Sequence, residues 1–180
     1  DGTLFEALSE RGDDLVLLQS AVNAREALES GVTTLRDNGG IRSTAFSMKR
    51  AVEQGIVPGP RMNICGRPLT MTGGHCWPMG GEVNGPDSVR TVVREQLKAG
   101  ADYVKVMATG GGTPGTYPSR ASLSLEELKA AVHEAHSWGR LAVAHATGNQ
   151  GIERVLDAGF DMIAHCSFYE AEGGYAYRAD

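Results

Sequence analysis

Three side chains able to bind metal or move protons fall at or near the ends of three successive apolar stretches. Lys105 lies within "YVKV", His145 closes "LAVAH", and His165 closes "DMIAH". A single polar residue in such a place is commonly structural. If the three stretches are neighbouring parallel strands, however, their carboxyl ends share one edge of the sheet, and the three side chains converge there.

The two histidines point to metal chemistry when they are taken together. For either one alone, a hydrogen-bonded structural role stays open. Neutral imidazole is a common Zn²⁺ ligand, and two such ligands on rigid strands supply half of a tetrahedral site. The pair His145 and His165 therefore favours a divalent metal site.

Lys105 admits three interpretations. As an ammonium ion it has no lone pair for a metal, and it can simply extend from the strand end to solvent. Desolvation can instead free its amine to attack a carbonyl as a Schiff-base nucleophile. Reaction with CO₂ would give a carbamate, a carboxylate-like group that can bridge two metals. Only the carbamate accounts for Lys105, His145 and His165 together.

The elements that would position these residues repeat along the chain. An amphipathic helical pattern, a glycine, a short apolar run and then polar or glycine-rich residues recur four times, and Ser124 with Glu127 fits a capping box at one helix start. Alternation of this kind predicts parallel strands joined by helices. The predicted strands are residues 32–35, 61–65, 103–106, 141–145 and 161–165, with one further short helix at 43–54 and long connections at 66–86 and 109–123.

Two α/β architectures fit this pattern: an open doubly wound sheet, or part of a (β/α)₈ barrel. Complete barrels usually need roughly 200 residues or more, and this chain has 180. We expect a single domain over residues 1–180. If it is a barrel, we expect a partial one.

Composition limits the function classes. The net charge is −5, and there is neither a polybasic run nor an apolar stretch long enough to span a membrane. We therefore expect no nucleic-acid or membrane partner. Three cysteines without CxxC spacing indicate reduced thiols and a cytoplasmic protein, although the chain does not begin with methionine.

Five stretches in order along the chain resemble the metal-dependent amidohydrolase superfamily. The resemblance is to the branch of Xaa-Pro dipeptidases, arginine or lysine carboxypeptidases and imidazolonepropionase-like enzymes. The stretches are "SGVTTLRDNGG", "VPGPRMNICGRPLTMTGGH", "AGADYVKVMATGG", "AVAHATG" and "IAHCSF".

The resemblance implies a (β/α)₈ barrel with a binuclear zinc site. Lys105 would be the carbamylated bridging lysine on the fourth strand, and His145 and His165 the metal ligands on strands five and six. His75, in the loop after strand three, would face the substrate. The reaction would be hydrolysis of a C-terminal peptide or related amide bond in a small-molecule or peptide substrate by metal-activated water.

The chain also departs from the family pattern. The first-strand His-x-His motif would lie before Asp1, and the eighth-strand aspartate beyond Asp180. We therefore expect strands two to six only, and a chain that cannot complete catalysis alone. Asn38 and Cys76 are atypical for their motifs and put substrate details in doubt. Two further histidines, His133 and His136, fall on a predicted helix away from the strand ends and are expected at the surface.

Two other hypotheses stay open. A Schiff-base aldolase would use Lys105 but has no need of histidines on the next two strands. A non-catalytic barrel fragment would cover its open sheet edges by swapping or by forming a homo-oligomer. The loop "TGGGTPG" at 109–115 lacks the P-loop lysine, so we expect a flexible active-site loop that needs close backbone approach.

Overall fold

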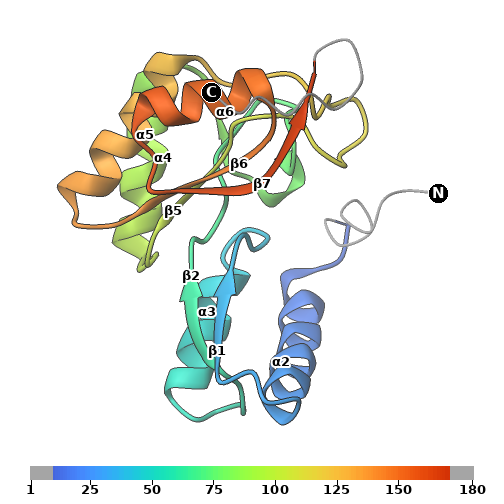
Figure 1. The fold of residues 1–180 in the computed structure, drawn as a ribbon. Helices are drawn as coiled ribbons and strands as arrows, with labels where there is room; N and C mark the ends of the chain where they lie inside the picture. The colour runs from blue at the N-terminus through green and yellow to red at the C-terminus, as the bar shows by residue number, and fades with distance from the viewer. Residues whose placement is uncertain (1–9, 171–180) are drawn as a thin grey trace.

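The computed structural model describes residues 10–170. Its N-terminal part holds helix α2 (Asp13–Glu29), strand β1 (Thr34–Asp37), helix α3 (Thr44–Glu53) and strand β2 (Arg61–Ile64). The strands β1 and β2 pair in parallel, with Thr34 opposite Arg61 and Asp37 opposite Ile64. Figure 1 shows this two-stranded sheet in the lower part of the view, with α3 overlapping the strands and α2 to their right.

Strand β1 begins two residues later than the predicted strand at 32–35. The reason is the way α2 ends. Gly31 adopts a left-handed φ of 97°, and the Val32 amide donates to the carbonyl of Ala27 at 3.0 Å. Val32 is thus held by the closing turn of the helix, in the manner of a glycine C-cap, and cannot yet pair with β2.

The C-terminal part is a parallel sheet in the order β5–β6–β7. Helices α4, α5 and α6 lie together on one face of this sheet, as Figure 1 shows. This confirms the predicted alternation of strands and helices. The elements are α4 (Gly85–Ala99), β5 (Val104–Met107), α5 (Leu125–Ser137), β6 (Ala142–Gly148), α6 (Asn149–Ala158) and β7 (Met162–Tyr169).

The connection at 66–86, predicted as a loop, contains additional structure. It forms strands β3 (Thr70–Met71) and β4 (Glu82–Val83), which pair with each other, and a 3-10 helix η1 (Trp77–Met79). Just before β3, Leu69 bridges to Val106; its amide donates to the carbonyl of Lys105 at 2.8 Å. Two-residue strands carry no periodic signal, so the sequence could not reveal them.

The main core lies between β5–β7 and helices α4–α6. Val104 and Val106 of β5 contribute to it from one face of the strand, while Lys105 and Met107 alternate to the other face. The predicted capping box of α5 is present: Ser124 accepts from the Glu127 amide at 3.2 Å, and the Ser124 amide donates to the Glu127 carboxylate at 2.8 Å. None of the helices in residues 10–170 is long and apolar enough to cross a lipid bilayer.

Candidate active site

The structure brings His75, His145 and His165 together in one row. The ring centroids of His75 and His145 are 4.6 Å apart, and those of His145 and His165 are 4.7 Å apart. The lysine of the same set, Lys105, lies on β5 beside the strand that carries His145. Residues up to 90 positions apart, from His75 to His165, therefore meet on one side of the sheet.

Lys105 is buried, with 3% of its surface exposed. Its backbone is fixed on both sides, because Val143 of β6 lies opposite it and Leu69 donates to its carbonyl. The only hydrogen bond of its Nζ within residues 10–170 is a long one of 3.7 Å to the sulfur of Met107, a weak acceptor. The ammonium form is thus poorly compensated.

His145 sits on the same face as Lys105 because the register places it opposite Met107. It is the fourth residue of β6, and the strand continues to Gly148, past the predicted end at His145. Its Nε2 lies 2.9 Å from the carbonyl oxygen of Gly110. A carbonyl only accepts, so this contact places the proton on Nε2 and leaves the lone pair on Nδ1.

His165 reaches the cluster through irregular backbone. The register pairs it with Ala146, whose side chain belongs to the main core, so regular alternation would direct His165 away from His145. His165 and Cys166 instead have φ values of 76° and 46°, in the left-handed region that such residues rarely adopt. The observed ring contact with His145 goes with this break in the strand.

His75 is positioned by the glycine-rich loop that follows β5. Its Nδ1 lies 2.9 Å from the hydroxyl of Thr113, which also accepts from the Cys76 amide at 3.0 Å. A Cβ at Gly111 would lie 2.5 Å from the His75 ring, so this glycine is required for the contact. The predicted close approach is confirmed; Thr113 was missed, because a threonine in an aperiodic loop gives no signal.

Desolvation disfavours the charged forms of these side chains, most strongly for the buried Lys105 and His145. Desolvation, reinforced by repulsion from Lys105, lowers the pKa of His75 to about 4. Desolvation likewise lowers the pKa of His145 to about 3, against the opposing effect of the Gly110 carbonyl, and it lowers the pKa of His165. The pKa of Lys105 falls to about 8, mainly by desolvation, although the neighbouring thiols of Cys65 and Cys76 oppose the shift.

The donor chemistry of these residues can be compared with what a metal ion requires. Neutral imidazoles are the form that binds zinc, and a lysine with a pKa of about 8 has a minor free-amine fraction near neutral pH. Within residues 10–170, no group of three or more histidine, cysteine, aspartate or glutamate side chains is arranged to hold a metal ion. The described donors therefore fit a metal as a partial set that includes the lysine.

The other two histidines lie elsewhere. His133 and His136 are exposed on α5, as predicted. His136 is not free, since its Nε2 lies 2.9 Å from the carboxylate of Asp161, which also accepts from the Ala142 amide at 2.7 Å. This contact joins α5 to Asp161, the residue just before β7, and has no part in the histidine cluster.

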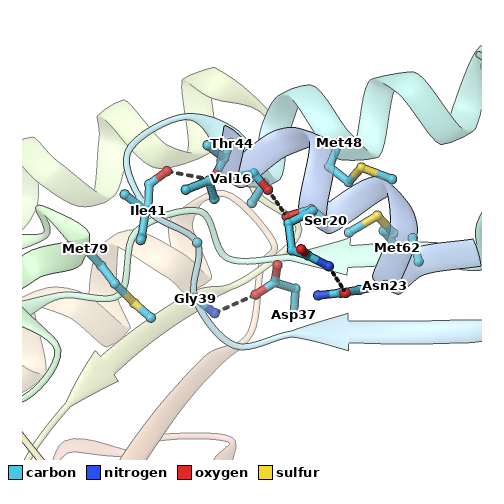
Figure 2. Close-up of a pocket in the computed structure, with 14 residues that line it drawn as sticks. Val16, Ser20, Asn23, Asp37, Gly39, Ile41, Thr44, Met48, Met62 and Met79 are labelled. Carbon is cyan, nitrogen blue, oxygen red and sulfur yellow. Dashed lines mark hydrogen bonds between the residues drawn. The ribbon is translucent and has the colours of Figure 1, made fainter. Parts of the chain in front are cut away.

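A separate cavity of about 290 Å³ lies between α2, α3 and the loop after β1. Figure 2 shows Asp37 accepting from the Gly39 amide, with Ser20 of α2 above Asp37 and Asn23 of α2 beside it. Burial raises the pKa of Asp37, and the Gly39 amide opposes that shift. Neither Lys105 nor any histidine lines this cavity, so the convergence of reactive groups places the candidate active site elsewhere.

Comparisons with known proteins agree with the arrangement of helices and strands. The amidohydrolase family profile matches residues 18–176. Ochratoxinase of Aspergillus niger is 32% identical over 173 residues, which cover 82% of this chain and 35% of the relative. The chain thus spans about a third of the length of the curated relatives that it matches.

Two solved structures share the fold. The crystal structure of a Xaa-Pro dipeptidase with bound methionine in its active site superposes with a TM-score of 0.83 at 30% identity, over 91% of this chain and 44% of that one. The crystal structure of the A. niger ochratoxinase gives a TM-score of 0.76 at 29% identity, over 87% of this chain and 42% of that one. The predicted α/β architecture of a partial (β/α)₈ barrel is confirmed, and the chain belongs to the amidohydrolase family.

Proposed function

We propose that this chain supplies part of the active centre of a metal-dependent hydrolase that cleaves an amide bond in a peptide or an N-acyl amino acid. The observation that carries the proposal is the meeting of two neutral strand-borne imidazoles, His145 and His165, on the side of the sheet where Lys105 is desolvated. Family membership and the names of the relatives, a dipeptidase and ochratoxinase, support the same reaction class.

Lys105 is suited to become a carbamate. With its pKa lowered to about 8, part of the population carries a neutral amine at neutral pH. The amine attacks CO₂, one N–C bond forms and one proton leaves. The product is an anionic group with two oxygen donors, which replaces an uncompensated buried ammonium ion.

The metal set in the proposal is Lys105 as its carbamate, His145 and His165. When bound, one or two zinc ions would supply a water of lowered pKa and a Lewis acid for the scissile carbonyl. The chain's own contribution is to hold His145 neutral by burial and to fix its ring through the Gly110 carbonyl. An imidazole oriented by a hydrogen bond on its second nitrogen is the usual arrangement at such centres.

His75 is proposed to contact the substrate. Its pKa of about 4 keeps the ring neutral, so it can donate a single hydrogen bond to a carbonyl oxygen without adding charge to the site. The Thr113 hydroxyl and the backbone of Gly111 hold the ring in place.

The test is zinc binding, measured by isothermal titration and by metal analysis of the dialysed chain in bicarbonate buffer. His145→Ala is expected to weaken zinc binding at least tenfold, or about 1.4 kcal/mol. The matched control is His133→Ala, which removes an exposed histidine from α5 and should leave zinc affinity unchanged. Equal effects of the two substitutions, or zinc binding that survives His145→Ala unchanged, would contradict the proposal.

Amide hydrolysis is the second readout, on dipeptides and N-acyl amino acids, with the protein in its full length. Lys105→Met should abolish zinc-dependent hydrolysis. Borohydride treatment in the presence of a carbonyl substrate separates the Schiff-base alternative, because a covalent adduct on Lys105 would support an aldolase and overturn the hydrolase.

A further inference from the structure

We propose that Thr70 is a positioning residue for the modified lysine, and that its hydroxyl donates a hydrogen bond to the carbamate on Lys105. The inference rests on the proposed function, because it takes the carbamate from there and assigns it a partner. It adds a residue of strand β3, which the sequence did not predict, to the lysine and the three histidines of the candidate site.

Thr70 carries the one buried side-chain polar atom within residues 10–170 that has no hydrogen-bond partner. The residue is fully buried, and its backbone amide is satisfied by the Gly81 carbonyl at 3.0 Å, so the hydroxyl alone is left over. A buried hydroxyl without a partner costs free energy, and buried polar groups are nearly always paired for that reason. The hydroxyl of Thr70 therefore points to a partner that the unmodified chain does not supply.

The groups packed around the hydroxyl are already used. A Cβ at Gly74 would lie 2.4 Å from Oγ1 of Thr70, so the turn before His75 packs directly on this oxygen. The Gly74 amide, however, donates to the carbonyl of Met71 at 2.8 Å. The turn thus closes the hydroxyl off without pairing it, and the partner is to be sought across the face of the sheet.

The strand register puts Thr70 on the face that carries Lys105. Leu69 bridges to Val106 in parallel, and both side chains belong to the main core. The next residues, Thr70 and Met107, therefore alternate to the opposite face, side by side on neighbouring strands. Lys105 lies on that face too, two residues before Met107. Strands β3 and β5 also lie against each other.

The lysine side chain ends in the same layer as Thr70. Its Nζ lies 3.7 Å from the sulfur of Met107, so the side chain runs along β5 toward the residue beside Thr70. Neighbouring strands are only about 4.7–4.9 Å apart. Both Lys105 and Thr70 are buried, so neither side chain has solvent as an alternative partner.

Addition of CO₂ to Lys105 supplies the missing acceptor. The Nζ lone pair bonds to the carbon of CO₂, one C=O electron pair moves to oxygen, and one proton leaves the nitrogen. The group gains two acceptor oxygens beyond Nζ. Each has more than one lone pair, so an oxygen that accepts from the Thr70 hydroxyl can still contact a metal. Thr70 donates without losing its proton, which keeps the step balanced.

The test measures the carbamate itself, by carbon NMR of the full chain in isotope-labelled bicarbonate, with and without added zinc. Thr70→Val keeps the shape of the side chain and removes the donor. It is expected to lower the equilibrium constant for CO₂ addition about tenfold, as expected for a lost hydrogen bond to a charged group. Thr70→Ser keeps the donor and should keep the carbamate. Lys105→Met assigns the signal, and Thr91→Val, at an exposed threonine of α4, is the matched control.

Urea unfolding gives a second readout that a purely structural role of Thr70 would not move. Without CO₂, Thr70→Val should be at least as stable as the unmodified chain, because it removes a buried hydroxyl that has no partner. With bicarbonate, the unmodified chain should gain stability and the variant should gain less, because CO₂ adds to its folded state more weakly.

The outcomes separate this inference from the proposed function. A carbamate that forms equally in the unmodified chain and in Thr70→Val would overturn the role of Thr70 and leave the proposed function standing. So would an equal loss in Thr91→Val or in Thr70→Ser, or a stability difference that does not depend on CO₂. If the unmodified chain forms no carbamate with or without zinc, the modified lysine of the proposed function is refuted, and the role of Thr70 with it.

Discussion

The two parallel sheets of this chain differ in how completely their strands are buried. Every residue of β5 and β6 is buried, whereas β1 alternates between exposed and half-buried positions and only Ile64 of β2 is buried. The covering helices differ in the same way. Helix α2 leaves a row of large apolar side chains in solvent, formed by Leu15, Leu18 and Val22.

The difference shows where the chain can hold reactive groups accurately. Lys105 and His145 lie on the two strands with the most complete burial, and packing on both faces of these strands restricts where the two side chains can lie. His165 lies on β7, which is only partly buried, and its backbone is irregular there. Side chains of the candidate site are therefore packed most completely on β5 and β6 and less completely on β7.

The largest test of this contrast compares two leucines on helices. Leu128 of α5 is fully buried in the main core, whereas Leu18 of α2 is 64% exposed. Leu128→Ala should lower the free energy of unfolding by about 2–5 kcal/mol through lost burial and a residual cavity. Leu18→Ala should change it by less than about 0.5 kcal/mol. Urea denaturation measures both, and similar losses would show that α2 is as well packed in solution as α5.

A smaller effect is expected from tightening the packing behind β5. Gly151 of α6 faces Thr109, and a Cβ there would lie 2.2 Å from the Thr109 methyl carbon. Gly151→Ala should therefore destabilise the chain by about 1–3 kcal/mol, despite the better helix propensity of alanine. Gly112→Ala is the control, since nothing lies within 4 Å of its Cβ position. A gain in stability for Gly151→Ala would mean that α6 packs against Thr109 loosely enough to accept a methyl group.

The smallest expected effect concerns ion pairs and pH. Glu134 of α5 is buried, and its carboxylate accepts two hydrogen bonds from the Arg94 guanidinium of α4, at 2.7 and 2.8 Å. The Arg94 hydrogen bond holds the pKa of Glu134 below its ordinary value of 4.5, against the effect of burial. A lowered folded-state pKa stabilises the fold above the unfolded-state pKa, and this contribution is lost as pH falls through the folded-state pKa.

Glu134→Gln should accordingly cost stability at neutral pH, and the difference from the unmodified chain should shrink as the solution is acidified below pH 4.5. The control is Glu29→Gln in α2, which removes an exposed pair with Arg25 and should change stability by less than about 0.5 kcal/mol at any pH. Thermal unfolding across the pH range measures both. A pH-independent cost for Glu134→Gln would rule out the charge as its cause.

Sequence reasoning predicted the regular parts of the fold because they repeat locally. Helical periodicity and glycine stops gave each of the main helices, and apolar runs gave each main strand to within a few residues. The prediction at 32–35 was wrong at its start because a helix C-cap used the Val32 amide. Strands β3 and β4 were missed because two residues carry no period.

The sequence by itself determined which residues of the candidate site to consider. Lys105, His145 and His165 follow from residue type and place in a repeated unit, and His75 follows from the family resemblance. Their roles as ligands and substrate contact stay predictions. Only the tertiary structure decided that His75 meets His145 and that Leu69 closes the free side of β5. The physical reason is range. Helical and strand periodicity depends on a few neighbouring residues. Burial, the lowered pKa values and the contacts between loops depend on segments 30 to 100 residues apart, which no local pattern encodes.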